Sequence, residues 1–158
     1  MTEEQFTRAA EKYMDTVYRI AVSYLKSPDA ADDITQETFL RLFRADTVFE
    51  SEAHLKNWLI RVCINECKRS FFSARYKTEA LEDYADKLSF STAENSGVFQ
   101  AVMTLPRKYR LVIHLHYYEG YTTPEIARFL KIPPSTVRTQ LERGRRLLKQ
   151  TLLEADNV

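Results

Sequence analysis

The chain has 158 residues, of which 44% are hydrophobic and 28% are charged, proportions that are ordinary for a globular protein and exclude disorder throughout. This length allows one medium or two small domains. No apolar run approaches the roughly 20 residues of a membrane span, and the acidic start at Glu3 and Glu4 does not suit a signal peptide. We expect a cytoplasmic protein with no direct membrane insertion.

Charge is organised by segment, although the formal net charge is only +1. Residues 1–77 carry 12 cations and 12 anions, residues 78–97 have a net charge of −4, and residues 98–158 have a net charge of +5. Three glycines and a long-period apolar spacing favour helices over sheets. We predict an all-α chain with two small helical domains, over 1–75 and 98–158. A flexible acidic linker over 76–97 would serve as a tether or, alternatively, mimic nucleic acid.

Three amphipathic helices are predicted in the N-terminal domain. The first spans about residues 5–24, and its apolar face consists of Tyr13, Val17, Ile20 and Tyr24. Ser27 and Pro28 suit the cap and the first turn of a second helix, DAADDITQETFLRLFRA. The third helix spans about residues 53–72.

The second helix has an apolar side and a charged side. The apolar side consists of one line with Ile34, Thr38 and Leu42 and an adjacent line with Phe39 and Phe43. The polar side has acids early and arginines late: Asp32, Asp33, Gln36, Glu37, Arg41 and Arg44. This order complements the helix dipole, which by itself can explain the pattern. A surface for a partner protein is the alternative.

The third helix combines aromatic, amide and cationic side chains, the mixture that single-stranded DNA requires. Trp58 is interpreted as a core residue. Asn65 is different, because an amide has poor propensity in the middle of a helix.

Cys63 and Cys67 are the only cysteines, and they are four residues apart on the third helix. Their Cβ atoms should be about 5–6 Å apart, wider than the roughly 3.5–4.5 Å of a disulfide, so we expect reduced, buried thiols. No zinc set, activated nucleophile or phosphate-binding glycine loop is recognisable, so neither catalysis nor a cofactor is predicted. An enzyme with a divalent metal at Asp32, Asp33 and Glu37 would lack a second carboxylate-rich helix.

Residues 122–149 are typical of two short helices joined by a tight turn. Three apolar residues recur at one-turn spacing in the first helix: Ile126, Ala127 and Leu130. Pro124 fits its first turn, where the missing N–H is no loss. Residues 132–134, Ile-Pro-Pro, then stop the helix, because proline removes a donor and disfavours helical angles in the preceding residue.

The second of these helices carries an apolar stripe and a strongly basic face. The stripe consists of Val137, Leu141, Gly144 and Leu148. From Lys131 to Lys149, six cations accompany a single anion, Glu142, which gives about +5 formally. Hydroxyls near the helix start and arginines further along suit base edges and phosphates. These residues are Ser135, Thr136, Arg138, Thr139, Arg143 and Arg146. A solvated face on a packing helix is the alternative.

The segment resembles the C-terminal promoter-binding domain of bacterial sigma factors, in the extracytoplasmic function (ECF, group 4) form of the sigma-70 family. The resemblance rests on four stretches, Leu105-Pro106, 117–121 with Gly120, Glu125-Ile126-Ala127 and Ser135-Thr136-Val137-Arg138. It implies that the six polar residues just given contact the promoter −35 element. One departure is Lys131, where such turns usually have a glycine, and a left-handed residue there would cost about 1 kcal/mol.

Residues 33–42, DITQETFLRL, are similar to the part of sigma region two that docks on the clamp coiled coil of the polymerase largest subunit. The residues implied in that contact are Asp33, Gln36, Glu37 and Leu40. NWLIRVCIN resembles the segment where the −10 element melts and a flipped base is captured. The residues implied there are Asn65, Lys68 and Arg69, although the family often has an acid where Arg69 aligns.

The resemblance therefore implies a sigma factor, a DNA-binding specificity subunit and not an enzyme. Its implied partners are promoter DNA, an anti-sigma factor, and core RNA polymerase through the clamp coiled coil and the flap. The main alternative is a helix-turn-helix regulator that binds an operator by itself, usually as a dimer. That alternative leaves residues 33–42 unexplained, and no heptad run supports a dimer.

Overall fold

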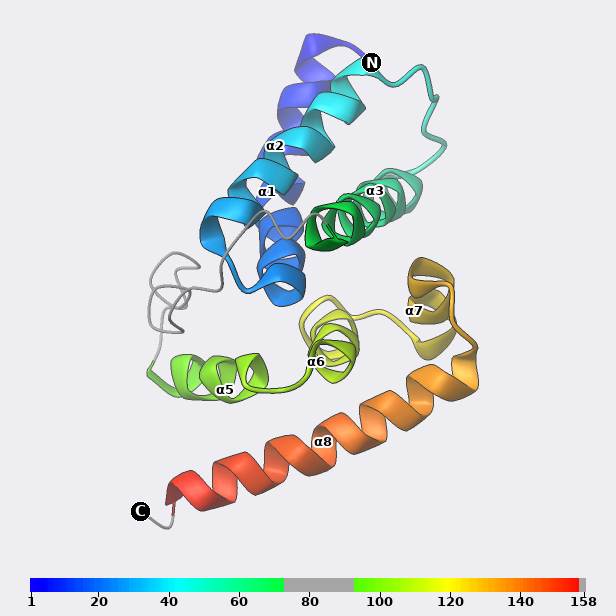
Figure 1. The fold of residues 1–158 in the computed structure, drawn as a ribbon. Coiled ribbons are helices and arrows are strands. Elements are labelled where there is room, and N and C mark those ends of the chain that lie inside the picture. Colours follow the sequence, from blue (N-terminus) through cyan, green and yellow to red (C-terminus); the bar gives the residue numbers. More distant parts are fainter. Residues whose placement is uncertain (73–92, 157–158) are drawn as a thin grey trace. The chain divides into compact units, whose positions relative to one another are not determined.

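The computed structural model describes residues 1–72 and 93–156 and divides the chain into two compact units, Met1–Thr78 and Glu79–Val158. Every regular element within the described residues is a helix, which confirms the all-α prediction (Figure 1). Most of the predicted linker, residues 76–92, lies outside the described residues. The first residues after this gap are already helical.

The first unit is a bundle of three helices, α1 (Glu3–Leu25), α2 (Pro28–Arg44) and α3 (Glu52–Phe72), each of which packs on the other two (Figure 1). The apolar face predicted for α1 is buried, and so is the line of α2 with Leu42. Ser27 caps α2 as expected, because its Oγ accepts a hydrogen bond from the Ala30 N–H at 3.2 Å. The large side chains that are almost completely buried in this core include Val17, Ile20, Leu42, Leu59, Ile60 and Ile64.

Both cysteines belong to this core. Cys63 and Cys67 are buried and free, which confirms the prediction of reduced thiols. The Cys63 thiol donates to the Val17 carbonyl at 3.5 Å, so it packs as a small apolar group with a weak polar contact. Trp58 is only half-buried, and its ring packs edge-on against Phe49 with the centroids 5.6 Å apart.

A polar contact joins α1 to the first residue of α3. The Tyr13 hydroxyl donates to Glu52 Oε2 at 2.6 Å, and Lys12 Nζ lies 3.2 Å from the same oxygen. The hydrogen bond from Tyr13, and next the one from Lys12, lower the pKa of the Glu52 carboxyl below its ordinary value. The contact fixes the end of the connection between α2 and α3.

The second unit contains α5 (Ala93–Met103), α6 (Arg107–Ile113), α7 (Thr123–Leu130) and α8 (Pro134–Asp156). Helix α5 begins at Ala93 rather than at the predicted Val98. Helices α5, α6 and α7 all pack on α8. Gly144 makes the close approach to α6 possible, because a Cβ there would lie 3.1 Å from Ile113 Cγ1 and 3.3 Å from Tyr109 Cβ.

The helix that begins at Arg107 changes its winding after Ile113. A π-helix, η1 (His114–Tyr118), follows α6 and ends with Glu119 N–H donating to the His114 carbonyl at 3.2 Å. His114 Nε2 lies 3.2 Å from Glu119 Oε2, and both side chains are less than one-tenth exposed. The wider turn thus brings two nearby polar residues into contact, which a regular helical periodicity does not predict.

Helices α7 and α8 form the predicted helix-turn-helix. Thr122 and Glu125 cap α7 reciprocally, and Pro124 lies in its first turn. Lys131 ends α7 in the left-handed conformation with φ 58° and ψ 45°, as the departure from glycine at this position led us to expect. The Ile132 N–H then bonds to the Ala127 carbonyl at 3.1 Å, and α8 begins at Pro134.

Lys131→Gly should raise the stability of the second unit by about 1 kcal/mol, because glycine adopts the left-handed conformation without a clash of its Cβ. Native-state amide hydrogen exchange of α7 and α8 in the whole chain measures this change. Lys131→Ala is the control, since it removes the charge but keeps the strain. Equal protection in the two variants would show that Lys131 is not strained.

Glu52→Gln should reduce the amount of stability that the first unit loses as the pH falls. The lowered pKa means that the carboxylate contributes stability above its ordinary value of 4.5 and loses that contribution as the pH falls through the folded value. Urea unfolding can be followed through Trp58, the only tryptophan in the chain, which lies in this unit. Glu11→Gln, at an exposed position of α1, should keep the wild-type loss of stability on acidification. An unchanged slope in Glu52→Gln would contradict the assignment.

Candidate functional site

The first half of α8 presents the predicted basic face to solvent. Val137 and Leu141 are buried against the rest of the unit, and Gly144 touches α6. This packing turns the opposite face outward, where Thr136 is half-buried and the other five predicted residues are exposed: Ser135, Arg138, Thr139, Arg143 and Arg146. The structure therefore places all six on one accessible surface, which we call the α8 face.

The cations of α8 differ in what they contact. Arg138 and Arg143 have no ion pair among the described residues, whereas Arg146 Nη2 lies 3.2 Å from Glu142 Oε1 in an exposed i,i+4 pair. Such exposed pairs contribute little stability, so Arg146 can exchange its partner for a phosphate at small cost. Arg145 instead donates to the Tyr117 hydroxyl at 2.9 Å, which directs it toward the π-helix.

Sequence reasoning missed a contribution of α6 to the α8 face. Lys108 is exposed, and its Nζ lies 5.1 Å from the centre of the Tyr109 ring. The first turn of α6 borders a notch of about 300 Å³ on the surface, lined by Lys108, Tyr109, Ser135, Thr136, Thr139, Gln140 and Arg143. The notch thus adds a cation and an aromatic ring to the predicted set. Adjacent cations at Arg107 and Lys108 were the available signal, but only the packing of α6 on α8 places them here.

Gln140 contributes a further polar group to this notch. Its Oε1 is buried and has no hydrogen-bond partner in the part of the chain that the structure describes. Buried acceptors are normally satisfied, so this oxygen is available to a donor once the surface is covered or the side chain turns.

The predicted residues of α2 also share one side of their helix. Asp33, Gln36 and Leu40 are exposed, and 44% of Leu40 is accessible to solvent. Glu37 is half-buried because its Oε1 accepts from Arg41 Nε at 3.2 Å. We call these four predicted residues, together with Phe43, the α2 face.

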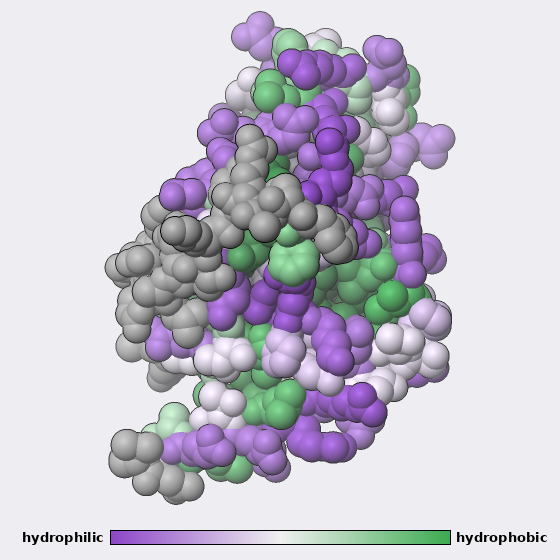
Figure 2. Space-filling view, in the orientation of Figure 1, coloured by the Kyte–Doolittle hydropathy of each residue, from purple (hydrophilic) through white to green (hydrophobic). Residues whose placement is uncertain are grey.

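Phe43 corrects the pattern drawn from the sequence, which placed it beside Phe39 on an apolar line. Phe39 is buried, but Phe43 is 65% exposed, and its ring packs edge-on against Phe6 with the ring centroids 5.5 Å apart. The neighbouring Leu42 is completely buried, so Phe43 lies at the border between the buried and the exposed side of α2. Residues 36, 40 and 43 then lie on one side at helical spacing. On the surface in Figure 2, such apolar areas are interspersed among hydrophilic side chains.

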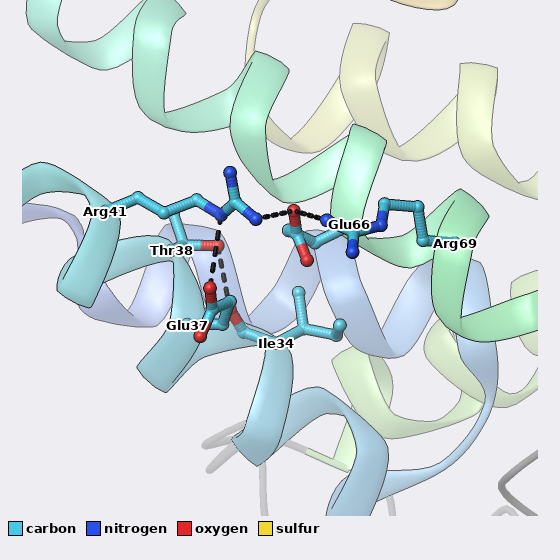
Figure 3. Close-up of polar contacts among 6 residues, drawn as sticks. All are labelled: Ile34, Glu37, Thr38, Arg41, Glu66 and Arg69. Carbon is cyan, nitrogen blue, oxygen red and sulfur yellow. Dashed lines mark hydrogen bonds and ion pairs between the residues drawn. The ribbon is translucent and has the colours of Figure 1, made fainter.

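The predicted residues of α3 are accessible to different degrees. Asn65 and Lys68 are half-buried, and Arg69 is exposed. Among the described residues the amide of Asn65 has no hydrogen-bonding partner, so it is available to an external group. Arg69 is not isolated, because its Nη1 donates to Glu66 Oε1 at 3.0 Å, and Arg41 Nη2 reaches the same oxygen from α2 at 3.0 Å (Figure 3). Glu66 and Arg41 were not predicted as site residues.

The first unit also has a groove of about 760 Å³ between the N-terminal half of α1 and residues 47–52. Charges of both signs line it, including Arg8, Lys12 and Glu50. None of the residues predicted to bind DNA or polymerase lies in this groove. The α2–α3 connection therefore forms a concave surface that sequence periodicity could not indicate, because the connection has no periodic pattern.

Within 1–72 and 93–156, no three histidine, cysteine or acidic side chains come together as a metal site, so Asp32, Asp33 and Glu37 do not form one. None of the helices over the same residues is both long enough and apolar enough to cross a membrane.

Comparison with known proteins links both units to one family. Residues 9–76 match the family described as Sigma-70 region 2, and residues 98–148 match Sigma-70, region 4. The chain is 27% identical to the ECF RNA polymerase sigma factor SigW of Bacillus subtilis, over 95% of this chain and 90% of that protein. It is 24% identical to the ECF RNA polymerase sigma-E factor of Escherichia coli, over 90% of this chain and 84% of that protein.

Solved structures support the fold. The sigma factor RpoE from Bartonella quintana, in complex with the anti-sigma factor NepR, matches with a TM-score of 0.73 and 17% identity, over 94% of this chain and 97% of that chain. CnrH, in complex with the cytosolic domain of CnrY, matches with a TM-score of 0.67 and 21% identity, over 98% and 91%. Since the two family matches cover the three-helix bundle and the helix-turn-helix in turn, the chain belongs to the sigma-70 family and is a sigma factor of the extracytoplasmic function type.

Proposed function

We propose that this sigma factor, which directs core RNA polymerase to specific promoters at transcription initiation, acts through three surfaces. The α8 face binds the −35 element, the exposed groups of α3 bind the −10 element, and the α2 face binds the polymerase. The observation that carries the proposal is the α8 face itself: one side of the helix is buried by apolar residues and the other presents exposed arginines beside hydroxyls. A packing helix has no need of such cations.

The α8 face has the chemistry of major-groove recognition. Guanidinium forks at Arg138 and Arg143 can bind guanine O6 and N7 in a bidentate manner, and hydroxyls near the helix start can reach bases or phosphates. Arg146 and the newly placed Lys108 extend the positive charge on either side, which suits the phosphate backbone. Because α7 and α8 are held by capping and by the turn at Lys131, the helix presents this face in a fixed orientation.

The α3 groups suit an unpaired strand. Asn65 has an amide that can donate to and accept from the edge of a flipped base, and Lys68 and Arg69 supply cations for phosphates. Since α3 lies in the other unit from α8, the two promoter elements would be read by separate parts of the chain. Connecting two binding units raises the effective concentration of each at its own element.

The α2 face suits a protein partner that is itself charged. Leu40 and Phe43 offer apolar area, and Asp33, Gln36 and Glu37 offer acceptors around it, the usual anatomy of an interface. We assign this face to the clamp coiled coil of the polymerase largest subunit, with the flap as a further contact of the chain. In this assignment the protein is a specificity subunit and not an enzyme, and it works in the cytoplasm with the polymerase.

Regulation by an anti-sigma factor is part of the proposal. Two structural relatives were solved in complex with proteins described as an anti-sigma factor and as a cytosolic domain. An equivalent partner of this chain would cover the α2 face or the α8 face and so keep it from polymerase or DNA.

Transcription by purified core polymerase on a library of randomised promoters tests the proposal. Start sites that appear only with the protein, and that share −35 and −10 boxes, are the expected result. The alternative of an operator-binding regulator would be supported if the protein alone shifted duplex DNA while core polymerase neither bound it nor gained start sites.

Arg138→Ala and Arg143→Ala should each weaken the free energy of promoter binding by about 1–3 kcal/mol. Each should also relax the base preference, at different positions of the −35 box. Selection from the same promoter library measures both effects. Arg145→Ala is the matched control, because it removes the same charge from the same helix but contacts Tyr117. Unchanged promoter selectivity in both test variants would contradict the assignment of the α8 face.

Leu40→Ala should weaken binding to core polymerase by about tenfold, or about 1.4 kcal/mol, because we place Leu40 among the few interface residues whose truncation costs more than about 1 kcal/mol. Fluorescence anisotropy of the labelled protein with core enzyme measures the affinity. Met14→Ala is the control, since Met14 on α1 is 43% exposed against 44% for Leu40. Equal affinities for the two variants would exclude Leu40 from the interface.

A further inference from the structure

A chain of charged side chains connects the α2 face to the groups of α3 proposed to bind the −10 element. Glu37 Oε1 accepts from Arg41 Nε at 3.2 Å, Arg41 Nη2 donates to Glu66 Oε1 at 3.0 Å, and Arg69 Nη1 donates to that same oxygen at 3.0 Å. Figure 3 shows Glu66 between the two arginines, one from each helix. The alternation of sign means that every charge in the chain has an opposite neighbour.

Glu66 differs from the other members in its burial. Its side chain is only 11% exposed, whereas the exposed fractions of Arg41 and Arg69 are 43% and 69%. A carboxylate with little access to water depends on its protein partners for hydrogen bonds, and bonds between ions are stronger than neutral ones. Glu66 is therefore the most constrained member of this series of charged side chains, and it holds the Arg69 guanidinium at one nitrogen.

Among the residues that the structure describes, this arrangement leaves most of the Arg69 guanidinium available. An arginine side chain has five N–H donors in a planar fork, and only one nitrogen of Arg69 contacts Glu66. A fork that is already held in one orientation loses less conformational entropy when it binds a base or a phosphate. Arg41 contributes by bonding to the same oxygen, because it fixes Glu66 from α2.

We propose that Glu66 is a positioning residue that, together with Arg41, holds the Arg69 guanidinium ready for −10 promoter DNA. The inference rests on the proposed function of α3 and adds two residues that do not themselves contact the DNA. It also predicts whether removing Glu66 strengthens or weakens DNA binding. If Glu66 acted only through long-range charge, its removal would strengthen binding to the DNA polyanion, whereas the loss of positioning weakens recognition of the −10 element.

The structural alternative is that Arg41 and Glu66 merely hold α2 and α3 together. That role would lower the stability of the bundle but would leave the base preference at −10 unchanged. A test must therefore measure stability and promoter choice separately, and it must correct for the change of one unit in net charge.

The experiment uses the full chain with core polymerase and compares Glu66→Gln and Glu66→Ala with Glu4→Gln. Glu4→Gln makes the same charge change and breaks an exposed pair with Arg8, and among the described residues neither side chain contacts Glu66 or Arg69. Promoter opening is followed by the fluorescence of 2-aminopurine in the −10 element, on the preferred sequence and on single-base substitutions. Urea unfolding through Trp58 fluorescence records the stability of the same unit.

We expect opening on the preferred sequence to fall roughly five- to tenfold in Glu66→Ala, and the discrimination against substituted sequences to shrink with it. Glu66→Gln keeps an oxygen acceptor and should lose less. Arg41→Lys, which keeps the charge but lacks the fork that reaches two carboxylates, should lose discrimination in the same direction. It provides the test if Glu66→Ala does not fold.

Two negative results have different meanings. A wild-type protein that gives core polymerase no promoter-dependent opening would overturn the proposed function, and the role of Glu66 with it. An active wild type whose Glu66→Gln and Arg41→Lys variants match Glu4→Gln in base preference would overturn the role of Glu66 alone, and so would a change in stability without a change in preference.

Discussion

The close contact between α6 and α8 at Gly144 is the constraint on which the DNA-facing half of the structure depends. With no Cβ at this position, Ile113 and Tyr109 reach the backbone of α8 at distances that any other residue would have to push apart. Val137 and Leu141 continue the same contact toward the start of the helix. Burial of one side thereby fixes which side faces solvent, and the orientation of Arg138 and Arg143 follows from that packing.

The same contact explains why the surface extends beyond α8. Because α6 lies against α8 at Gly144, the first turn of α6 reaches the start of the exposed face, and Lys108 and Tyr109 border a notch with Thr139 and Arg143. A helix held further away would leave these side chains apart. Sequence analysis could not assign Lys108 to this surface. Its position there depends on Gly144, because this glycine allows α6 to pack closely on α8.

In the first unit, charge rather than apolar packing distinguishes the functional sides of the helices. The core is made by residues such as Ile20, Leu42 and Ile60, and it would tolerate any polar residues outside. Instead, Arg41 pairs across the helix interface with Glu66, which also holds Arg69. The two arginines are exposed while the carboxylate between them is only 11% exposed. Such a carboxylate needs its partners for stability, and we interpret the arrangement as control of the orientation of Arg69 as well. Through Arg41 and Arg69, the α2 face and the exposed end of α3 are both connected to that carboxylate.

The sequence by itself determined the features that depend on neighbours along the chain. Helical periodicity, the caps at Ser27 and Thr122, and the left-handed Lys131 all follow from interactions within a few residues, and so did the spacing that excluded a disulfide between Cys63 and Cys67. The exposed polar residues of α8 could be predicted because a buried stripe implies an opposite face.

Tertiary structure alone decided the features that depend on which distant residues meet. No local pattern shows that Phe43 lies on the exposed side of α2, that the chain after Ile113 widens into a π-helix to bring Glu119 against His114, or that Glu66 is contacted by Arg41 from another helix. The physical reason is that burial and ion pairing are properties of an assembled surface. Periodicity tells which side of a helix is apolar, and only packing tells what each side touches.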